Sequence, residues 1–137
     1  MSSRKCSVLY FFYMKDQKAF DPELFFSALA DRTRLRLLNL MRDGEVCVCF
    51  FAETLGTNNP KISRHLAYLR RASLVTGRRE GKWMHYSIKP PVHRDAAAIF
   101  AATLKMLAAD PDMTADRTKL SDSCCVPAKI VSIFRRS

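Results

Sequence analysis

Two closely spaced cysteine pairs are the residues of this chain best suited to chemistry. Cys47 and Cys49 are separated by one residue, and Cys124 and Cys125 are adjacent. Thiolates are the protein ligands that soft metal and metalloid ions select. The first pair lies directly upstream of residues whose pattern predicts a DNA-reading helix and a basic hairpin. This proximity indicates a DNA-binding protein whose affinity for DNA changes when its thiolates hold a ligand.

Other kinds of thiol chemistry have less support. The five cysteines are an odd number without a secretory context, which favours reduced cytoplasmic thiols over a disulfide framework. Cys6 has no partner nearby in the sequence. A small thiol enzyme is a remote alternative, because the sequence has no Cys-X-X-Cys, no glycine-rich phosphate loop and no Asp/His arrangement to activate a cysteine. We therefore expect a protein that is not an enzyme and uses no organic cofactor.

The balance of charge points to a polyanionic partner. Lys and Arg number 23 against 13 Asp and Glu, a formal net charge of +10, which favours nucleic acid first and an anionic membrane surface second. No apolar run approaches the roughly 20 residues that span a bilayer, and the short apolar stretch 8–14 lacks a signal-peptide cleavage site. We expect a cytoplasmic protein without a membrane partner. The sequence permits a start at Met1 or at Met14.

The elements that must position the first cysteine pair are predicted to be helical. Hydrophobic residues make up 48% of the 137-residue chain, enough for one domain with a modest core. Capping residues and apolar periodicity predict a short helix opened by 21–23, then helices over 32–41 and 46–55. The third helix stops at Gly56 and is expected to contain both Cys47 and Cys49.

A fourth helix, over about 59–72, has the pattern of a helix that reads DNA. At about 100° per residue, its apolar side chains share one face and its cations the other. In a major groove the cations neutralise phosphates, and Ser, Asn or Arg near the helix N-terminus reach base edges. A basic face that only keeps the helix in solution is the alternative. The helix residues expected to contact DNA are Asn59, Lys61, Ser63, Arg64, Tyr68 and Arg71.

The segment after this helix predicts a β-hairpin with a cationic tip. Residues 74–79 and 82–88 favour strands, and Glu80-Gly81 between them favours a tight turn. Such a hairpin can contact the phosphate backbone or the minor groove. Trp83 is expected to be an aromatic residue of the hairpin or of the core. The hairpin residues expected to contact DNA are Arg78, Arg79 and Lys82.

An alanine-rich helix is predicted over about 92–108. Its wide apolar arc and small side chains favour close packing on a second helix, so we expect a symmetric dimer interface, with an intramolecular core helix as the alternative. Beyond Asp110-Pro111 the composition is polar as far as the second cysteine pair, which predicts a tail. The expected organisation is an N-terminal segment at 1–20, a DNA-binding and dimerisation domain at 21–108, and a Cys-containing tail at 109–137.

The run from 25 to 88 resembles the ArsR/SmtB family of metal- and metalloid-responsive repressors. Four strings occur in the family's order and at its spacing: ALADRTRLRLL at 28–38, EVCVC at 45–49, SRHL at 63–66 and RREGKW at 78–83. The resemblance implies a winged helix-turn-helix, mainly α with a small β-hairpin, dimeric through terminal helices. It implies a homodimer that binds an inverted-repeat operator in double-stranded DNA and releases it when an inducer binds. It also places His65 where it can contact DNA.

The EVCVC string is similar to the arsenic-sensing box of that family, which implies As(III) or Sb(III) as inducer. Those repressors often carry a third cysteine three residues after the second, and this chain has Ala52 there. Another branch binds zinc through Asp and His residues of the C-terminal helix. His93 and Asp95 could begin such a set, but later positions of the helix offer no nitrogen or oxygen ligands. We do not expect this zinc site.

Trivalent arsenic binds three sulfurs, and Cys47 and Cys49 supply only two. Residues at i and i+2 of a regular helix project about 160° apart, so the helix must distort or the two cysteines must divide their roles. The tail is long enough for Cys124 or Cys125 to complete the site, in the same subunit or its partner. A separate tail site, redox-active tail thiols and tail cysteines without a role are the alternatives. A thiol-redox switch and a soft divalent metal such as Cd or Pb remain open as signals for the same fold.

Overall fold

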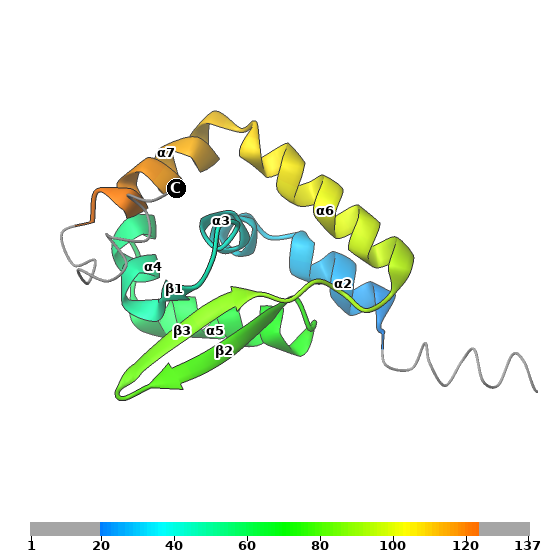
Figure 1. Cartoon of the computed structure of the whole chain (residues 1–137), viewed down its shortest axis with the longest axis horizontal. Coiled ribbons are helices and arrows are strands. Elements are labelled where there is room, and N and C mark those ends of the chain that lie inside the picture. Colours follow the sequence, from blue (N-terminus) through cyan, green and yellow to red (C-terminus); the bar gives the residue numbers. More distant parts are fainter. Residues whose placement is uncertain (1–19, 124–137) are drawn as a thin grey trace, which may run out of the picture.

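The computed structural model describes residues 20–123 (Figure 1). The predictions for Cys6, for the alternative starts and for Cys124 and Cys125 fall outside these residues. The elements in chain order are α2 (Pro22–Leu29), α3 (Arg32–Leu40), β1 (Val46–Cys47), α4 (Val48–Leu55), α5 (Asn59–Arg71), β2 (Val75–Glu80), β3 (Trp83–Ile88), α6 (Arg94–Ala108) and α7 (Pro111–Ser121).

Short polar side chains begin the first helices, as the sequence predicts. The carboxylate of Asp21 accepts the backbone N–H of Leu24 at 3.0 Å, and that of Asp31 accepts the N–H of Arg34 at 3.0 Å. The Asn58 side chain caps α5 in the same way. These contacts satisfy N–H groups that have no partner within the helix. Gly56 ends α4 at φ +65°, a conformation that favours glycine.

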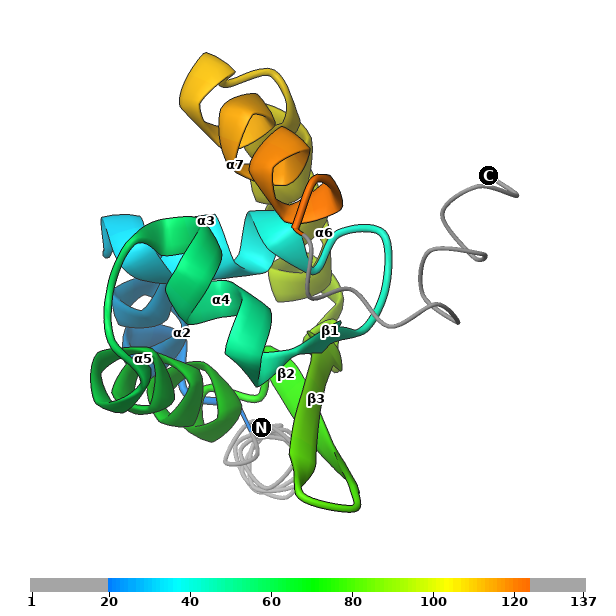
Figure 2. The ribbon, with the colours of Figure 1, turned by 90° about the vertical axis from the view of Figure 1, so that its left-hand side faces the viewer.

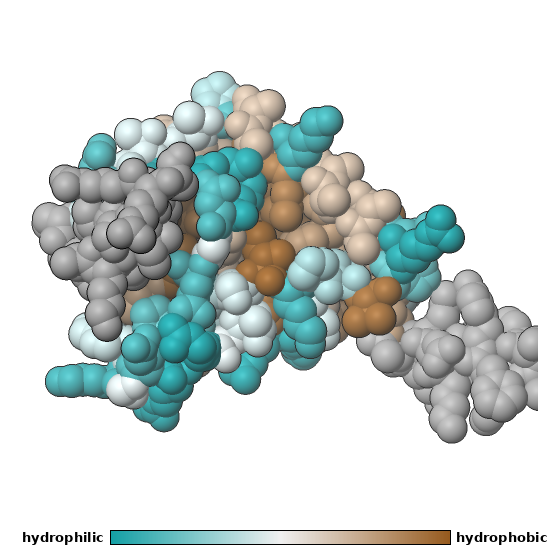
Figure 3. Space-filling model, viewed as in Figure 1, coloured by the Kyte–Doolittle hydropathy of each residue, from teal (hydrophilic) through white to brown (hydrophobic). Residues whose placement is uncertain are grey.

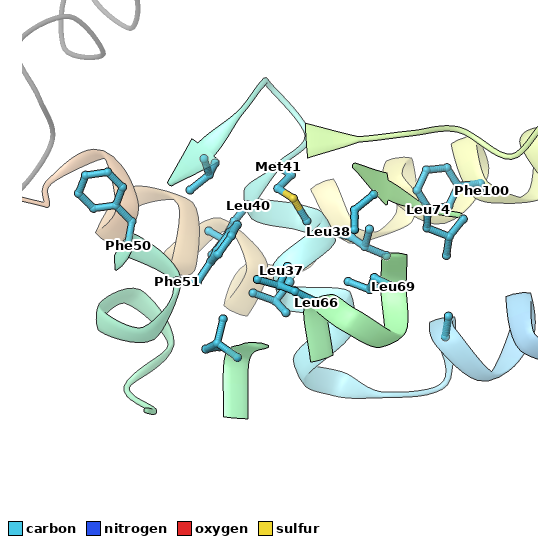
Figure 4. Close-up of a cluster of buried hydrophobic side chains, with 14 of the residues drawn as sticks. Leu37, Leu38, Leu40, Met41, Phe50, Phe51, Leu66, Leu69, Leu74 and Phe100 are labelled. Atoms are coloured by element: carbon cyan, nitrogen blue, oxygen red, sulfur yellow. The ribbon is translucent and has the colours of Figure 1, made fainter. Parts of the chain in front are cut away.

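The core is built around α3, which Figure 1 shows nearly end-on between the other helices. Leu37 and Leu38 are fully buried, and Figure 4 shows them among the side chains of α4, α5 and α6. Burial of each such aliphatic side chain contributes roughly 2 kcal/mol. The core side chains labelled there are Leu37, Leu38, Leu40, Met41, Phe50, Phe51, Leu66, Leu69, Leu74 and Phe100.

The three strands form one antiparallel sheet in the order β1-β3-β2. Strands β2 and β3 form the predicted hairpin, which we call the wing. Glu80 pairs with Trp83, so the two-residue turn is Gly81-Lys82 and not Glu80-Gly81 as predicted. Gly81 has φ +62°, which a two-residue hairpin turn requires at its first position and which glycine adopts without strain.

The third predicted helix is two residues too long at its N-terminus. Val46 and Cys47 instead form β1, where Val46 pairs with Tyr86 and Cys47 with His85 of the wing. Cys47 has extended backbone angles, φ −70° and ψ 140°, and α4 begins at the next residue. The pairing gives this segment hydrogen-bond partners on β3, and Val46 is a strand-favouring residue. The segment before the DNA-reading helix is therefore a strand followed by a helix.

The predicted tail contains a further ordered helix. Asp110 caps α7, and α7 packs against α3 through polar contacts. Arg36 donates two hydrogen bonds, of 2.7 and 2.8 Å, to the carboxylate of Asp116. The side-chain amide of Asn39, which is fully buried, donates to the carbonyl oxygen of Met113 at 2.8 Å. The packed part of the chain thus extends past residue 108.

The surface separates polar and apolar regions. Figure 3 shows hydrophilic residues over the wing and apolar ones along α6. The exposed fractions of Phe26 on α2 and of Ile99 and Met106 on α6 are 53%, 42% and 65%. α6 itself begins at Arg94 because His93 caps it, two residues later than predicted. Within residues 20–123, no helix is long and apolar enough to cross a membrane.

Candidate nucleic-acid interface and thiolate site

Helices α4 and α5 form a helix-turn-helix, and α5 packs on the core through one face only. Ile62, Leu66 and Leu69 are fully buried, which confirms the predicted apolar side. The opposite face is open to solvent, and α5 and the wing lie at the same end of the molecule (Figure 2). An exposed basic helix face of this kind fits the major groove of DNA. The exposed residues on this face that were predicted to contact DNA are Asn59, Lys61, Ser63, Arg64 and Arg71.

Tyr68 is half-buried and organises two of the arginines around α5. The guanidinium carbon of Arg34, from α3, lies 4.1 Å from the centre of the Tyr68 ring, and that of Arg71 lies 4.8 Å from it. Both distances are within the range of cation–π attraction. Arg34 also donates to the carbonyl oxygens of Ser27 and Ala28 at 2.7 and 2.9 Å. Tyr68 therefore links α5 to α3 and holds Arg71 at the edge of the exposed face.

His65 is directed toward α3. Its Nδ1 lies 3.7 Å from a carboxylate oxygen of Asp31 and 3.5 Å from Arg34. Burial lowers the pKa of His65 below its ordinary value, and Asp31 only partly offsets this. Burial raises the pKa of Asp31, but the backbone N–H and positive charge of Arg34 outweigh burial, so this pKa lies below its usual value. The Nδ1 side of the His65 ring thus contacts Asp31 and Arg34 within the protein. Contact between His65 and DNA remains a prediction.

The wing carries its cations at its exposed end, as predicted. Arg79 and Lys82 are exposed. Arg78 is also exposed, but it donates to both carboxylate oxygens of Glu45, at 3.1 and 2.6 Å, and to Glu80 at 3.2 Å. The hydrogen bond to Glu45 raises the pKa of Arg78, and the same contact lowers the pKa of Glu45. Arg78 therefore joins the wing to the residue that precedes β1.

The first cysteine pair is brought together by the change from strand to helix. Cys47 ends β1 and is buried, and Cys49 lies in the first turn of α4 and is half-buried. Their Sγ atoms are 3.3 Å apart. The predicted separation on opposite sides of one helix is wrong, because Cys47 lies outside the helix. Two thiolate bonds of about 2.3 Å span up to about 4.6 Å, so both sulfurs can hold one ion without distortion of α4.

The end of the described chain lies beside α4. The hydroxyl of Ser123 donates to the Glu53 carboxylate at 3.4 Å. Glu53 follows Cys49 by four residues and is one helical turn away from it, on the same side of α4. Cys124 and Cys125 lie outside the described residues. Ser123, which precedes them directly in the sequence, is thus on the face of α4 that carries Cys49.

The described residues offer no complete metal site. Among residues 20–123, no group of three or more His, Cys, Asp or Glu side chains is arranged to hold a metal ion. His93 caps α6 by accepting the N–H of Ala96 at 3.3 Å and stacks on Phe20 with ring centres 4.9 Å apart. The His93 ring therefore has a structural role at the start of α6.

A helix-turn-helix whose second helix is basic, followed by a cationic hairpin, defines the class of winged-helix DNA-binding proteins. Residues 31–76 match the family model described as a bacterial regulatory protein of the arsR family. The chain is 46% identical over 79 residues to the arsenical resistance operon repressor of Escherichia coli, covering 57% of this chain and 68% of that protein. The chain belongs to the ArsR family of transcriptional regulators, which are DNA-binding proteins and not enzymes.

Two further similarities extend the comparison. The chain is 47% identical over 72 residues to the arsenic resistance transcriptional regulator ArsR1 of Pseudomonas putida, covering 52% of this chain and 56% of that protein. Its fold is similar to the solution structure of a homodimeric winged helix-turn-helix DNA-binding domain from Mycobacterium bovis, a possible ArsR-family regulator. That similarity has a TM-score of 0.51 and 33% identity, and covers 79% of this chain and 87% of the other.

Sequence reasoning missed two residues that shape the candidate interface. Glu45 was only one letter of the cysteine motif, and its pairing with Arg78, 33 residues away, depends on how the sheet is assembled. Arg34 was an unremarked cation of α3, and its contact with Tyr68 depends on the packing of α3 against α5. The sequence shows only the positions of these residues along the chain, and neither contact can be predicted from those positions.

Proposed function

We propose that this protein is a transcriptional repressor that binds operator DNA as a homodimer and releases it when its cysteine thiolates bind As(III) or Sb(III). The observation that carries the proposal is the 3.3 Å distance between the sulfurs of Cys47 and Cys49. These two residues lie between the two DNA-binding elements, with β1 paired to the wing and α4 packed on α5. The similarity to arsenical-resistance regulators supports the same class of inducer.

Soft, thiophilic ions suit this pair of ligands. Thiolates select such ions over hard cations, which prefer carboxylate and carbonyl oxygens. Because the two sulfurs already lie within reach of one ion, little ordering of the protein is needed to bind it, and preorganisation of this kind raises affinity. Cys47 and Cys49 are therefore the two primary ligands, and the backbone of β1 and the first turn of α4 hold them in place.

A third thiolate is supplied by Cys124 or Cys125 in this proposal. Ser123 contacts Glu53 one turn from Cys49, and consecutive Cα atoms are about 3.8 Å apart. The paired cysteines that follow Ser123 are thus within reach of α4 of the same subunit. Since the first two sulfurs need no rearrangement to share an ion, recruitment of the third sulfur is the step that changes the structure.

The thiolate site is connected to both DNA-binding elements. Cys47 pairs with His85 of β3, and His85 in turn pairs with Arg78 of β2, so one row across the sheet joins the site to the wing. Glu45 adds an ion pair to Arg78 in parallel with that row. A displacement of residues 45–49 toward a third sulfur alters the position of the wing, and a displacement of α4 alters that of α5.

The exposed face of α6 is the proposed dimer interface. One side of α6 packs on the core through Ala96, Phe100 and Leu107, which are buried. Ile99 and Met106 on its other side are seven residues apart and exposed, and Phe26 of α2 is exposed as well. Large apolar side chains left open in one subunit favour a symmetric contact with a second.

The ligand set can be tested by counting the thiols that arsenite protects. The reduced protein, with and without arsenite, is treated with a chromogenic disulfide reagent until the arsenite-free sample has reacted completely, so that the buried Cys47 is counted as well. We expect arsenite to protect three thiols per subunit, and Cys47→Ser or Cys49→Ser to abolish protection. In the Cys124→Ser/Cys125→Ser variant, arsenite should bind more weakly and protect only two thiols. In Cys6→Ser, arsenite should protect as many thiols as in the wild type. Full protection in a Cys47→Ser/Cys49→Ser variant would rule out the proposed site.

A thiol-redox switch is the second candidate function. Sulfurs 3.3 Å apart need to approach only to about 2.05 Å to form a disulfide. In that case a mild oxidant, and not arsenite, removes the Cys47 and Cys49 thiols and releases DNA, and a reductant restores binding. The thiol count after each treatment separates the two functions.

A further inference from the structure

Trp83 is an exposed aromatic residue at the end of the wing. It is the first residue of β3, directly after the turn Gly81-Lys82, and 51% of its surface is exposed. Within residues 20–123 the other large exposed hydrophobic side chains lie on α2, on α6 or at Val92 just before α6. Trp83 is therefore separate from the apolar face that we assign to the dimer, and the dimer does not account for its exposure.

The charge around Trp83 identifies the kind of partner. Lys82 directly precedes Trp83 and is exposed, and Arg79, which pairs with Met84, is exposed on the opposite face of the same hairpin end. Glu80, which pairs with Trp83 across the hairpin, is already engaged by Arg78 at 3.2 Å. An exposed indole at a hairpin end that also carries the exposed cations Lys82 and Arg79 is suited to a surface that combines negative charge with flat apolar edges. The minor groove of DNA is such a surface, and proteins that bind it combine Arg or Lys with apolar wedges.

The position of the wing makes this contact geometrically reasonable. The wing projects from the end of the molecule that carries α5 (Figures 1 and 2), and β2 packs directly on α5. Gly77 lets the wing remain thin, because a Cβ there would lie 3.1 Å from the side chains of Met84 and Tyr86. With α5 in a major groove, a hairpin attached to α5 at the same end of the molecule can reach the neighbouring backbone and minor groove.

We propose that Trp83 is a DNA-contacting residue of the wing, whose indole packs against the sugar and base edges of the minor groove. The contact supplies apolar area that Arg79 and Lys82 cannot, and it is independent of the thiolate site. It rests on DNA binding by the helix and the wing, and not on the nature of the inducer.

Fluorescence of the reduced protein tests this contact, because the chain contains a single tryptophan. Formation of the complex is followed by anisotropy of a fluorescein-labelled operator duplex, and tryptophan emission and acrylamide quenching are measured on the same samples without arsenite. At saturation we expect emission to change and quenching by acrylamide to fall several-fold. Unchanged emission and quenching in a complex that anisotropy shows to be saturated would overturn the proposal.

Variants provide a second measure. Trp83→Ala should weaken operator binding roughly tenfold, in the range for loss of an aromatic contact to nucleic acid, while Trp83→Phe retains most of the affinity. Because no charge is lost, the salt dependence should stay the same, whereas Arg79→Ala should lower the salt slope by about 1. Thr76→Ala, which trims an exposed side chain at the base of the same hairpin, is the matched control. Wild-type affinity of Trp83→Ala would also overturn the proposal.

Discussion

Individual side chains determine how the helix-turn-helix presents its charge. Tyr68 lies between the guanidinium groups of Arg34 and Arg71, so it restrains one cation of the exposed face and attaches it to α3. Arg64, in contrast, is exposed on α5. A restrained arginine loses less conformational freedom when it binds a phosphate than an unrestrained one does. Arg64 and Arg71 of α5 are thus expected to contribute differently to DNA binding.

Arg64→Ala is predicted to weaken operator binding about tenfold and to reduce the slope of log affinity against log salt by about 1, because one cation leaves the interface. Anisotropy titrations at several salt concentrations measure both quantities. Lys119→Ala, on exposed α7 at the end of the molecule away from α5 (Figure 2), should leave both unchanged. Equal slopes for wild type and Arg64→Ala would show that Arg64 does not contact DNA.

His65 is predicted to make the fold less stable in mild acid. Burial lowers its pKa below the ordinary 6.5, so the unfolded chain binds the proton more readily. The contribution of neutral His65 to the free energy of unfolding is complete above about pH 6.5 and declines as the pH falls below that value. The pKa of Asp31 is also lowered, from an ordinary 3.8, so its contribution is lost only in stronger acid.

Urea unfolding at pH 7.5 and pH 5.5 measures this effect. The wild type should have the lower free energy of unfolding at pH 5.5, and His65→Gln should show a smaller difference between the two pH values. A wild-type protein that is equally stable or more stable at pH 5.5, with the variant behaving identically, would refute the assignment.

At the scale of elements, helix caps could be predicted from the sequence, whereas strand pairing between distant segments could not. The helix starts at Asp21, Asp31 and Asn58 were predictable because a cap and its N–H partner are three residues apart. β1 was missed because two residues show no periodicity, and its strand character depends on β3, about 40 residues later. That miss also placed the two sulfurs wrongly, although the cysteine motif itself was recognised.

Helix α7 was missed although its start carries a visible signal. Asp110-Pro111 repeats the cap-and-proline pattern of Asp21-Pro22. Its buried residues are Met113, Asp116 and Leu120, too few apolar positions to produce a helical stripe. Its attachment relies instead on a carboxylate and a backbone carbonyl that bind Arg36 and Asn39 of α3. Composition alone therefore indicated a polar tail.

Glu45→Gln is predicted to weaken communication between the thiolate site and the wing. The carboxylate is the group that joins residues 45–49 to Arg78, and its replacement removes the ion pair but leaves both cysteines. Arsenite should protect the same thiols, while the ratio of operator affinities without and with arsenite should fall severalfold. Glu80→Gln, which also loses a contact to Arg78, is the matched control and should retain the ratio. An unchanged ratio in Glu45→Gln would exclude this route.

At the scale of the whole molecule, the account requires two copies. α6 contributes one face to the core and leaves Ile99 and Met106 open on the other. Ile99→Asp/Met106→Asp is predicted to be monomeric in sedimentation velocity, because paired carboxylates cannot be buried in a symmetric contact. Loss of the second half-site contact should reduce operator affinity about a hundredfold or more. Thr118→Asp on α7 should remain dimeric. A dimer that survives both α6 substitutions would place the interface elsewhere.

The central claim is that the thiolates of Cys47 and Cys49 control the affinity of the protein for its operator. The most direct measurement is fluorescence anisotropy of a labelled duplex from the promoter that the protein regulates, titrated with arsenite at fixed salt, for wild type and Cys47→Ser. The account predicts tight binding by both proteins and stoichiometric release by arsenite for the wild type alone. Release of both proteins by arsenite, or of neither, would contradict it.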